Sequence, residues 1–444
     1  MTITNNFDLY ETVRPTERAL LIGAELKSGR PLLPVEQSLE ELDRLAATAG
    51  LEVVGRLWQR FDQPDPATFI GSGKVGEVDI LLKELDADVA LFDDELSPRH
   101  QRELERIFGE KVKVIDRTAL ILDIFAQHAQ TAEGQLQVEL AQLEYRLPRL
   151  TRMWTHLARQ AGGRAGGMGG GVGVRGPGEK QLEMDRREIG RRIATVKEEL
   201  DKVRMRREQH RAKRQQTALP VVAIVGYTNA GKSTLLNQLS GSDVLSVDRL
   251  FATLDPTTRR VKMPSGREAL FTDTVGFIQK LPTQIVAAFR ATLEEIAEAD
   301  VILHVADATH PQAAAQIEAV QDTLAELEVD HLPVVMALNK VDLLADGKDP
   351  LQALAVGLTA VPVSARTGYN IETLLLAVEA IMERYLQPLQ VFLPYQRGDL
   401  MSLFYERGQV VDESHHADGV RMSGQIPERL LPYFAPYVIE EEEV

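Results

Sequence analysis

A short apolar run that leads directly into a glycine-bounded loop constrains the fold of this chain more than any other feature. Residues 221–225, Val-Val-Ala-Ile-Val, have the length and the β-branched composition of a buried strand. Residues 226–233 read Gly-Tyr-Thr-Asn-Ala-Gly-Lys-Ser and match the phosphate-loop spacing G-x-x-x-x-G-K-S. In that motif, backbone N–H groups at a helix N-terminus surround nucleotide phosphates. The pattern predicts a doubly wound α/β domain.

Three later motifs follow in the order expected for a guanine nucleotide site. Residues 273–276 read Asp-Thr-Val-Gly, residues 339–342 read Asn-Lys-Val-Asp, and residues 364–366 read Ser-Ala-Arg. Each follows a predicted strand, so we expect them to meet at one edge of the sheet. The carboxylate of Asp342 can accept both N–H donors of the guanine Watson–Crick edge, a pair that adenine lacks. The set predicts selection of GTP over ATP.

The residue types assign chemistry to individual positions. Lys232 is expected to reach the β and γ phosphates, and the hydroxyl of Ser233 to bind Mg²⁺. Asp273 would contact Mg²⁺ directly or through water, and the amide of Gly276 would sense the γ-phosphate. These four residues predict a nucleotide site that responds to the presence of the third phosphate.

A second γ-phosphate contact is expected from a threonine of residues 251–258. We favour Thr253 as this sensor and as a Mg²⁺ ligand, with Thr257 and Thr258 as alternatives. Together with Lys232 and Gly276, Thr253 completes the predicted catalytic set. The predicted GTP-binding residues are Gly226, Tyr227, Thr228, Asn229, Ala230, Gly231, Lys232, Ser233, Thr234, Phe251, Ala252, Thr253, Asp273, Thr274, Val275, Gly276, Asn339, Lys340, Asp342, Ser364, Ala365 and Arg366.

Phe277 stands where many GTPases place a glutamine that orients the attacking water. Phenylalanine has no polar group for that task, so we expect slow intrinsic hydrolysis and an external activator. The alternative is a GTP-binding protein without activity, which the presence of Lys232, Ser233 and Asp273 disfavours. The side-chain carbonyl of Asn229 could help to hold a monovalent cation against the phosphates. Stimulation by K⁺ is therefore a further hypothesis.

A glycine run lies between two segments with heptad spacing. Ten of the seventeen residues from Gly162 to Gly178 are glycine. Apolar residues at heptad positions flank this run on both sides. Before the run they are Leu136, Leu140, Leu143, Leu147, Leu150, Trp154 and Leu157, and after it they are Leu182, Ile189, Ile193, Val196, Leu200 and Val203. This spacing predicts an antiparallel helical hairpin over residues 131–215, with a kink in its first helix at Pro148.

The predicted hairpin is basic, whereas the rest of the chain is acidic. Residues 142–215 hold 19 Lys and Arg against 9 Asp and Glu, a net charge of +10 in a chain of −16. Glycine exposes bare backbone, and arginine binds phosphate and stacks on bases, so we expect RNA binding. The candidate RNA-binding residues are Arg164, Arg175, Lys180, Arg186, Arg187 and Arg191. The alternative is a solvated coiled coil with a linker at its end.

Composition bounds the remaining possibilities. The 444 residues include no cysteine, which excludes disulfides and thiolate metal sites. The sequence has no apolar run near the roughly 20 residues of a membrane-spanning helix and no basic, apolar leader, so we expect a cytoplasmic protein. We also expect a monomer. The predicted domains are an α/β domain at 1–130, the hairpin at 131–215, the GTPase domain at 216–387 and a small α+β domain at 388–444.

The N-terminal domain contains one weak motif. Residues 71–74, Gly-Ser-Gly-Lys, follow a short apolar segment and open a predicted helix. They could bind a phosphate of ATP or RNA, but they lack the full phosphate-loop spacing. A tight strand-to-helix turn is the alternative.

With these features, the chain resembles the HflX family of translation-associated GTPases over nearly its whole length. The resemblance is specific at residues 169–183 of the glycine-rich region and at residues 251–259. It implies binding to the large ribosomal subunit and its rRNA, with the hairpin tip near the peptidyl transferase centre. It also implies GTP-dependent separation of ribosomal subunits under stress, ribosome-stimulated hydrolysis, and an association of the N-terminal domain with ATP.

Three other functions stay open on the sequence alone. The chain could be a ribosome-assembly GTPase that acts on precursor rRNA, or a GTP-binding module whose coiled coil recruits a protein partner. It could also use an N-terminal ATPase to remodel RNA, in which case Lys74 should be required for ATP turnover.

Overall fold

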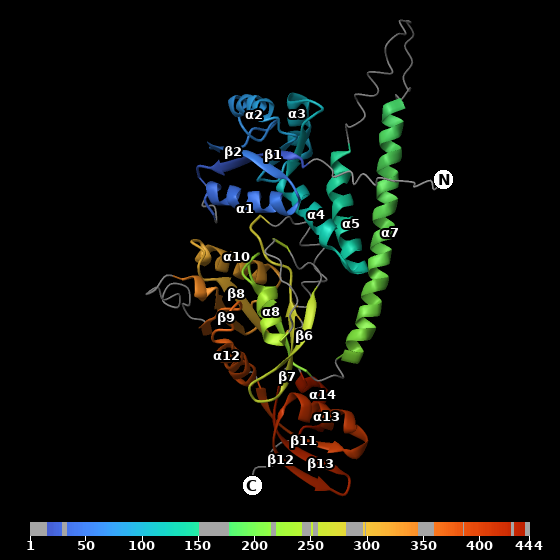
Figure 1. The fold of residues 1–444 in the computed structure, drawn as a ribbon. Coiled ribbons are helices and arrows are strands. Elements are labelled where there is room, and N and C mark those ends of the chain that lie inside the picture. Colours follow the sequence, from blue (N-terminus) through green and yellow to red (C-terminus); the bar gives the residue numbers. More distant parts are fainter. Residues whose placement is uncertain are drawn as a thin grey trace, which may run out of the picture. The chain divides into compact units, whose positions relative to one another are not determined.

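The computed structural model describes residues 16–28, 33–150, 177–214, 219–241, 250–251, 256–280, 296–297, 299–344, 359–384, 386–427 and 430–439. The chain divides into two compact units, Met1–Ile124 and Phe125–Val444 (Figure 1). Among the helices that these residues form, none is long and apolar enough to cross a membrane.

The N-terminal unit is built on a four-stranded parallel sheet with the order β2-β1-β3-β4. Its elements, in chain order, are β1 (Arg18–Leu26), α1 (Val35–Thr48), β2 (Glu52–Phe61), α2 (Ser72–Glu84), β3 (Val89–Phe92), α3 (Pro98–Phe108), β4 (Lys113–Asp116) and the first part of α4 (Arg117–His128), which continues into the second unit at Phe125. The central strands are buried on both faces, as expected for a parallel sheet between helices. The predicted α/β alternation is confirmed.

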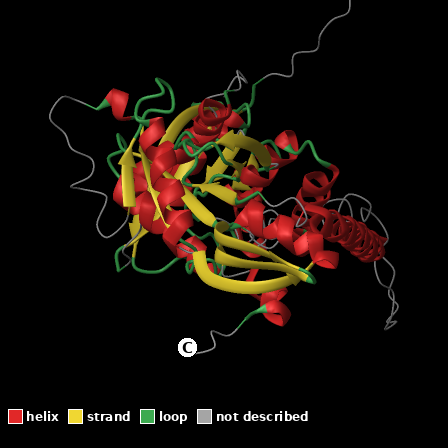
Figure 2. Cartoon of the chain, turned by 90° about the horizontal axis from the view of Figure 1, so that it is seen from below, coloured by secondary structure: helices red, strands yellow, loops and turns green. Residues whose placement is uncertain are grey.

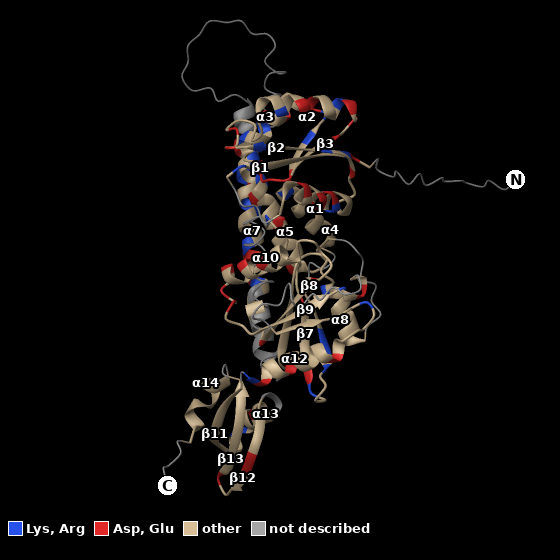
Figure 3. Ribbon diagram, turned by 90° about the vertical axis from the view of Figure 1, so that its left-hand side faces the viewer, with Lys and Arg blue, Asp and Glu red and all other residues tan. Residues whose placement is uncertain are grey.

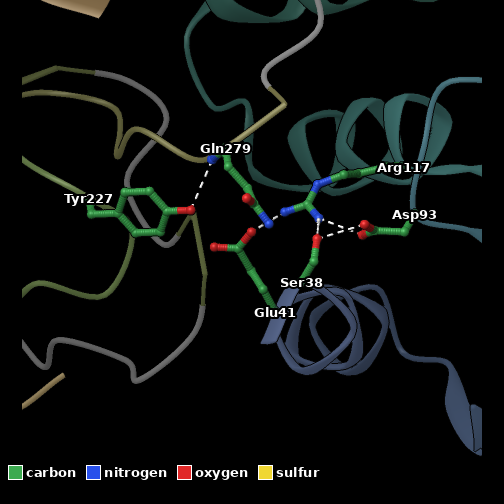
Figure 4. A network of polar contacts seen from close by, with 6 residues as sticks. All are labelled: Ser38, Glu41, Asp93, Arg117, Tyr227 and Gln279. Atoms are coloured by element: carbon green, nitrogen blue, oxygen red, sulfur yellow. Dashed lines mark hydrogen bonds and ion pairs between the residues drawn. The ribbon is translucent and has the colours of Figure 1, made fainter. Parts of the chain in front are cut away.

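A buried ionic cluster lies where β3 and β4 end. Arg117, at the start of α4, is 1% exposed and donates from Nη1 to Oδ1 of Asp93 at 2.7 Å. The hydroxyl of Ser38 donates to the other oxygen of Asp93 at 2.6 Å, and Glu41 forms an ion pair with Arg117 (Figure 4). Since Ser38 and Glu41 belong to α1, the cluster joins α1, the end of β3 and the start of α4.

The basic segment contains α5 (Ala132–Arg146), a 3₁₀ turn at Leu147–Arg149 and α7 (Pro177–Arg214). α5 ends before Pro148, where the sequence predicts a kink. Glu139 of α5 forms an ion pair with Arg192 of α7 at 2.6 Å, and Glu144 forms one with Lys197 at 2.9 Å. Both members of the second pair lie five residues further along the chain, so α5 and α7 run parallel where they touch.

This direction corrects the prediction that the segment before the glycine run is one helix antiparallel to the segment after it. Heptad spacing identifies the seam of a helix but carries no information on chain direction. The turn at Leu147–Arg149 ends α5, so the predicted single helix does not continue from α5 through Pro148. The rest of the predicted hairpin, residues 151–176, lies outside the described residues.

The next segment forms a six-stranded sheet with the order β10-β9-β8-β5-β7-β6, in which only β6 is antiparallel to its neighbour. Its elements are β5 (Val221–Val225), α8 (Lys232–Ser240), β6 (Thr257–Lys262), β7 (Glu268–Asp273), β8 (Val301–Asp307), α10 (Ala313–Glu326), β9 (Val334–Asn339), a 3₁₀ turn at Val341–Leu343, β10 (Thr359–Pro362) and α12 (Ile371–Arg384). α8 and α12 pack on one face and α10 on the other. This is the predicted doubly wound fold.

The last segment is a three-stranded antiparallel sheet with the order β11-β13-β12, covered by short helices (Figure 2). Its elements are β11 (Leu386–Pro394), a 3₁₀ turn at Tyr395–Arg397, α13 (Gly398–Arg407), β12 (Gln409–His416), β13 (Gly419–Pro427), α14 (Leu431–Phe434) and a 3₁₀ turn at Ala435–Tyr437. β13 continues through Pro427, and α14 begins at Leu431.

Candidate nucleotide-binding site

The phosphate loop joins β5 to α8 and depends on two glycines in backbone conformations that disfavour side chains. Gly226 has φ 152° and Gly231 has φ 96°. A Cβ atom on Gly226 would collide with the carbonyl of Val305, and one on Gly231 with Nδ2 of Asn339. The loop is therefore held tightly against β8 and β9 by positions that only glycine fits.

Lys232 lies at the first position of α8 and folds back over the loop. Its Nζ donates to the carbonyl oxygens of Gly226 at 3.1 Å and Tyr227 at 2.9 Å. Burial lowers the pKa of Lys232 to about 8, against the opposing attraction of Asp273. A buried ammonium with a depressed pKa is suited to bind an anion, because the incoming negative charge favours its protonated form.

The two predicted metal ligands of the loop and of β7 lie together. The hydroxyl of Ser233 donates to Oδ2 of Asp273 at 2.6 Å. Oxygen donors of this kind fit Mg²⁺, which is usually held by one or two protein groups, water and substrate phosphates. The described residues contain no group of three or more acidic, His or Cys side chains that could hold a metal by themselves. The geometry fits a metal that is shared with a nucleotide.

The segment after β7 continues along the phosphate loop. The amide of Thr228 donates to the carbonyl of Phe277 at 2.7 Å, and the amide of Phe277 donates to the carbonyl of Gly226 at 3.1 Å. The hydroxyl of Tyr227 accepts from the amide of Gln279 at 2.9 Å (Figure 4). The ring of Phe277 is buried, so this position places no polar side chain at the site.

The guanine motif is tied to the phosphate loop through Asn339. Its Nδ2 donates to the carbonyl of Ala230 at 2.9 Å, and its Oδ1 accepts from the amide of Ala365 at 2.9 Å. Asn339 therefore joins the loop, β9 and the Ser364–Arg366 segment. Asp342 is exposed in the 3₁₀ turn after β9, where its carboxylate can meet a base.

Several contacts at the site are not evident from the motifs. Lys340, with φ 66°, forms an ion pair from Nζ to Asp307 at 2.7 Å. Asp307 is the last residue of β8. The sequence indicates its place at the site only through this position, because ligand-binding residues lie at the carboxyl ends of parallel strands. His304 is buried on the same strand, where burial and then Lys232 lower its pKa to about 4.

The structure leaves the predicted switch threonine undecided. Ala252 and Thr253 lie outside the described residues. Phe251 is buried and packs edge-on against Phe125, with ring centroids 4.6 Å apart. Thr257 and Thr258 lie in β6, and the hydroxyl of Thr258 pairs with that of Thr272 at 3.0 Å. Thr253 stays a prediction, with these two residues as alternatives.

The predicted RNA-binding residues lie along α7 as far as the structure describes them. Arg186, Arg187 and Arg191 are exposed. Blue stretches of the ribbon mark Lys and Arg along α7 in Figure 3. Arg187 forms an ion pair with Glu183 of the same helix at 2.8 Å. The described residues do not include Arg164 or Arg175, nor the side chain of Lys180.

The weak N-terminal motif forms the cap of α2. The amide of Gly71 donates to Oε1 of Gln59 at 3.0 Å, and Lys74 forms an ion pair with Glu77 at 2.6 Å. The amide and the ammonium that would bind a phosphate thus have protein partners. These contacts favour the tight turn over the phosphate site.

Comparison with known proteins agrees with this geometry. Family models described as "GTP-binding GTPase N-terminal", "GTP-binding GTPase Middle Region" and "50S ribosome-binding GTPase" match residues 36–126, 128–214 and 221–340. GTPase HflX of Magnetococcus marinus is 45% identical over 406 residues, covering 91% of each chain. GTPase HflX of Escherichia coli is 41% identical over 414 residues, covering 93% of each chain.

A solved structure of a GTP-binding protein from Sulfolobus solfataricus in complex with GDP is 24% identical and covers 83% of this chain and 99% of its own. Its TM-score of 0.43 is too low to support a conclusion. The sequence relatives do support one, because their identity extends over nearly the full length of both chains. The chain belongs to the HflX family and is a GTP-hydrolysing enzyme.

Proposed function

We propose that this GTPase binds the large ribosomal subunit and, in its GTP-bound state, separates the subunits of stalled or stress-affected ribosomes. Hydrolysis, stimulated by the ribosome, then releases the protein. One observation carries the proposal: a complete phosphate loop faces a buried, apolar Phe277 where many GTPases have a glutamine. A site that binds GTP but lacks this water-orienting side chain needs a partner to complete it.

The charge distribution supports an RNA-rich partner. Exposed arginines follow α7, whereas the chain as a whole has a net charge of −16. A basic element on an acidic protein directs contact to one polyanion surface and disfavours non-specific adhesion. The family model over residues 221–340 is described as a 50S ribosome-binding GTPase, which supports the large subunit and its rRNA as that surface.

The nucleotide-site residues receive the roles that their positions support. Lys232, Thr253 and Gly276 would stabilise the γ-phosphate during hydrolysis. Mg²⁺ would be held by Ser233 and Thr253, with Asp273 acting through water, and the contact between Ser233 and Asp273 supports this pairing. Loss of the γ-phosphate would release Thr253 and Gly276, which couples hydrolysis to a change of ribosome affinity.

Two further parts of the proposal concern ions and location. Asn229 is exposed at the loop with φ 59°, and its carbonyl could hold K⁺ against the phosphates. A role on the ribosome places the protein in the cytoplasm, where we propose that it acts as a monomer. ATP binding by the N-terminal unit stays a separate hypothesis, which the contacts of Gly71 and Lys74 disfavour.

Co-sedimentation with purified large ribosomal subunits across a salt series tests the partner. With a non-hydrolysable GTP analogue, we expect binding that weakens steeply with salt. Replacement of Arg186, Arg187 and Arg191 by glutamine should reduce the slope of log K against log salt by about 2 to 3. The matched control replaces three exposed basic residues of the N-terminal unit, which are Lys83, Arg106 and Lys111.

Equal binding of the α7 variant and the unmodified protein at every salt concentration would contradict the proposal. Tighter binding to precursor particles than to mature subunits would contradict subunit separation and favour ribosome assembly. Binding to a protein partner, with none to large subunits, would favour a regulatory module.

A further inference from the structure

Thr228, the third residue of the phosphate loop, has a buried hydroxyl group that forms no hydrogen bond with the described residues. The residue is 7% exposed, and its Oγ1 has no hydrogen-bond partner in the part of the chain that the structure describes. Its backbone amide donates to the carbonyl of Phe277. Its role in nucleotide binding so far rests on the loop motif, which involves backbone groups and not this side chain.

Two other buried threonines do form side-chain hydrogen bonds. The hydroxyl of Thr274 donates to the carbonyl of Ile224 at 2.7 Å, and that of Thr272 pairs with Thr258 at 3.0 Å. A buried hydroxyl without a partner destabilises the protein that contains it, whereas valine has nearly the same shape and no such penalty. The ligand-free structure therefore gives no reason for threonine at position 228.

The position of Thr228 points to the terminal phosphate. A Cβ atom added to Gly276 would lie 2.9 Å from Nζ of Lys232 and 3.0 Å from both Cα and Cγ2 of Thr228. The Thr228 side chain and the Lys232 ammonium therefore flank the same residue of the segment after β7. Because Lys232 is the residue expected to bind the γ-phosphate, that phosphate would lie close to the Thr228 side chain.

We propose that the Thr228 hydroxyl donates a hydrogen bond to the γ-phosphate of GTP and stabilises its charge during hydrolysis. In this reaction, water adds to the γ-phosphorus while the bond to the β–γ bridging oxygen breaks, which gives GDP and phosphate. Thr228 keeps its proton throughout. Its hydroxyl supplies a polar side-chain contact beside the segment where Phe277 supplies none.

Single-turnover GTP hydrolysis by the full chain, without ribosomes, tests this assignment. Thr228→Val should slow the chemical step about 100-fold, since removal of one positioned donor to a developing charge has about this effect. Its affinity for GDP should change less than about 2-fold, and the ligand-free variant should melt at the same temperature or higher, because the unpaired hydroxyl is gone. Thr228→Ser should recover the rate to within about 3-fold.

Thr323→Val is the matched control, because the Thr323 hydroxyl bonds within its own helix, to the carbonyl of Ala319 at 2.8 Å. Its rate should equal that of the unmodified protein. An unchanged rate in Thr228→Val would overturn the proposal. A loss of GDP affinity as large as the loss of rate in Thr228→Val would overturn it too, because the substitution would then disturb the whole loop. A Thr228→Ser variant as slow as Thr228→Val would also overturn it, because a hydroxyl at this position would then not be enough to restore the rate.

Discussion

Asp342→Asn tests the proposed contact between the Asp342 carboxylate and the guanine base separately from the phosphate contacts of the site. Asp342 is exposed in the 3₁₀ turn at Val341–Leu343, so its replacement should change the free energy of unfolding by no more than about 0.5 kcal/mol. The carboxylate can accept both N–H groups of guanine, whereas the asparagine amide presents one acceptor and one donor group.

The expected loss follows from two hydrogen bonds to a charged acceptor. Each contributes about 1.5–3 kcal/mol, so their loss together amounts to about 3–6 kcal/mol. At about 1.4 kcal/mol for each factor of ten, the Kd for GTP and GDP should rise by about 10²- to 10⁴-fold. Xanthine carries a carbonyl where guanine carries its amino group, and the asparagine N–H can donate to it. The affinity for xanthosine nucleotides should therefore increase.

Competition between a fluorescent guanine nucleotide and unlabelled nucleotides measures these changes. Asp322→Asn, at an exposed position of α10, is the matched control and should bind GTP like the unmodified protein. A loss of GTP affinity below about 3-fold in Asp342→Asn, with an unchanged melting temperature, would refute Asp342 as the residue that reads the base.

Three further predictions concern contacts inside the two units. Asn339→Ala leaves the buried carbonyl of Ala230 and the amide of Ala365 without their hydrogen-bond partner, so the free energy of unfolding measured in urea should fall by about 2–4 kcal/mol. A fall of less than about 0.5 kcal/mol would show that Asn339 does not join these two segments. The pKa of Lys232 is about 8 without ligand, and phosphates should raise it, so GTP binding at pH 8.5 should take up roughly 0.7 proton and weaken as pH rises further. Calorimetry in two buffers of different ionisation enthalpy measures this uptake, and none at pH 8.5 would refute it. Arg117→Met leaves Asp93 buried without its cation and should destabilise the N-terminal unit by about 3–5 kcal/mol. Trp58 fluorescence in a Trp154→Phe background reports this unit, and an unchanged urea midpoint would contradict the estimate.

Much of the fold was predictable because its signals are local. The apolar run at Val221–Val225, the loop after it and the polar residues that end β7 and β9 each occupy a few consecutive residues. Parallel strands bring their carboxyl ends to one edge of the sheet, so the sequence alone predicts that the motifs lie together.

The contacts between distant segments were not predictable in this way. Asn339 and Ala230 are 109 residues apart, and nothing in either segment specifies their hydrogen bond. The cluster around Arg117 combines α1, the end of β3 and α4, so it arises only from tertiary packing. The direction of α5 relative to α7 was predicted wrongly, because heptad spacing does not encode chain direction.

We propose that the ribosome completes a GTPase site whose Phe277 cannot orient water, and that the glycine-rich segment connects the two. GTP turnover should be measured with and without purified large ribosomal subunits, for the full chain and for a chain with residues 162–178 deleted. We predict strong stimulation by large subunits that is lost on deletion, while affinity for GTP is retained. Equal turnover with and without large subunits, by a full chain that still binds GTP, would contradict the account.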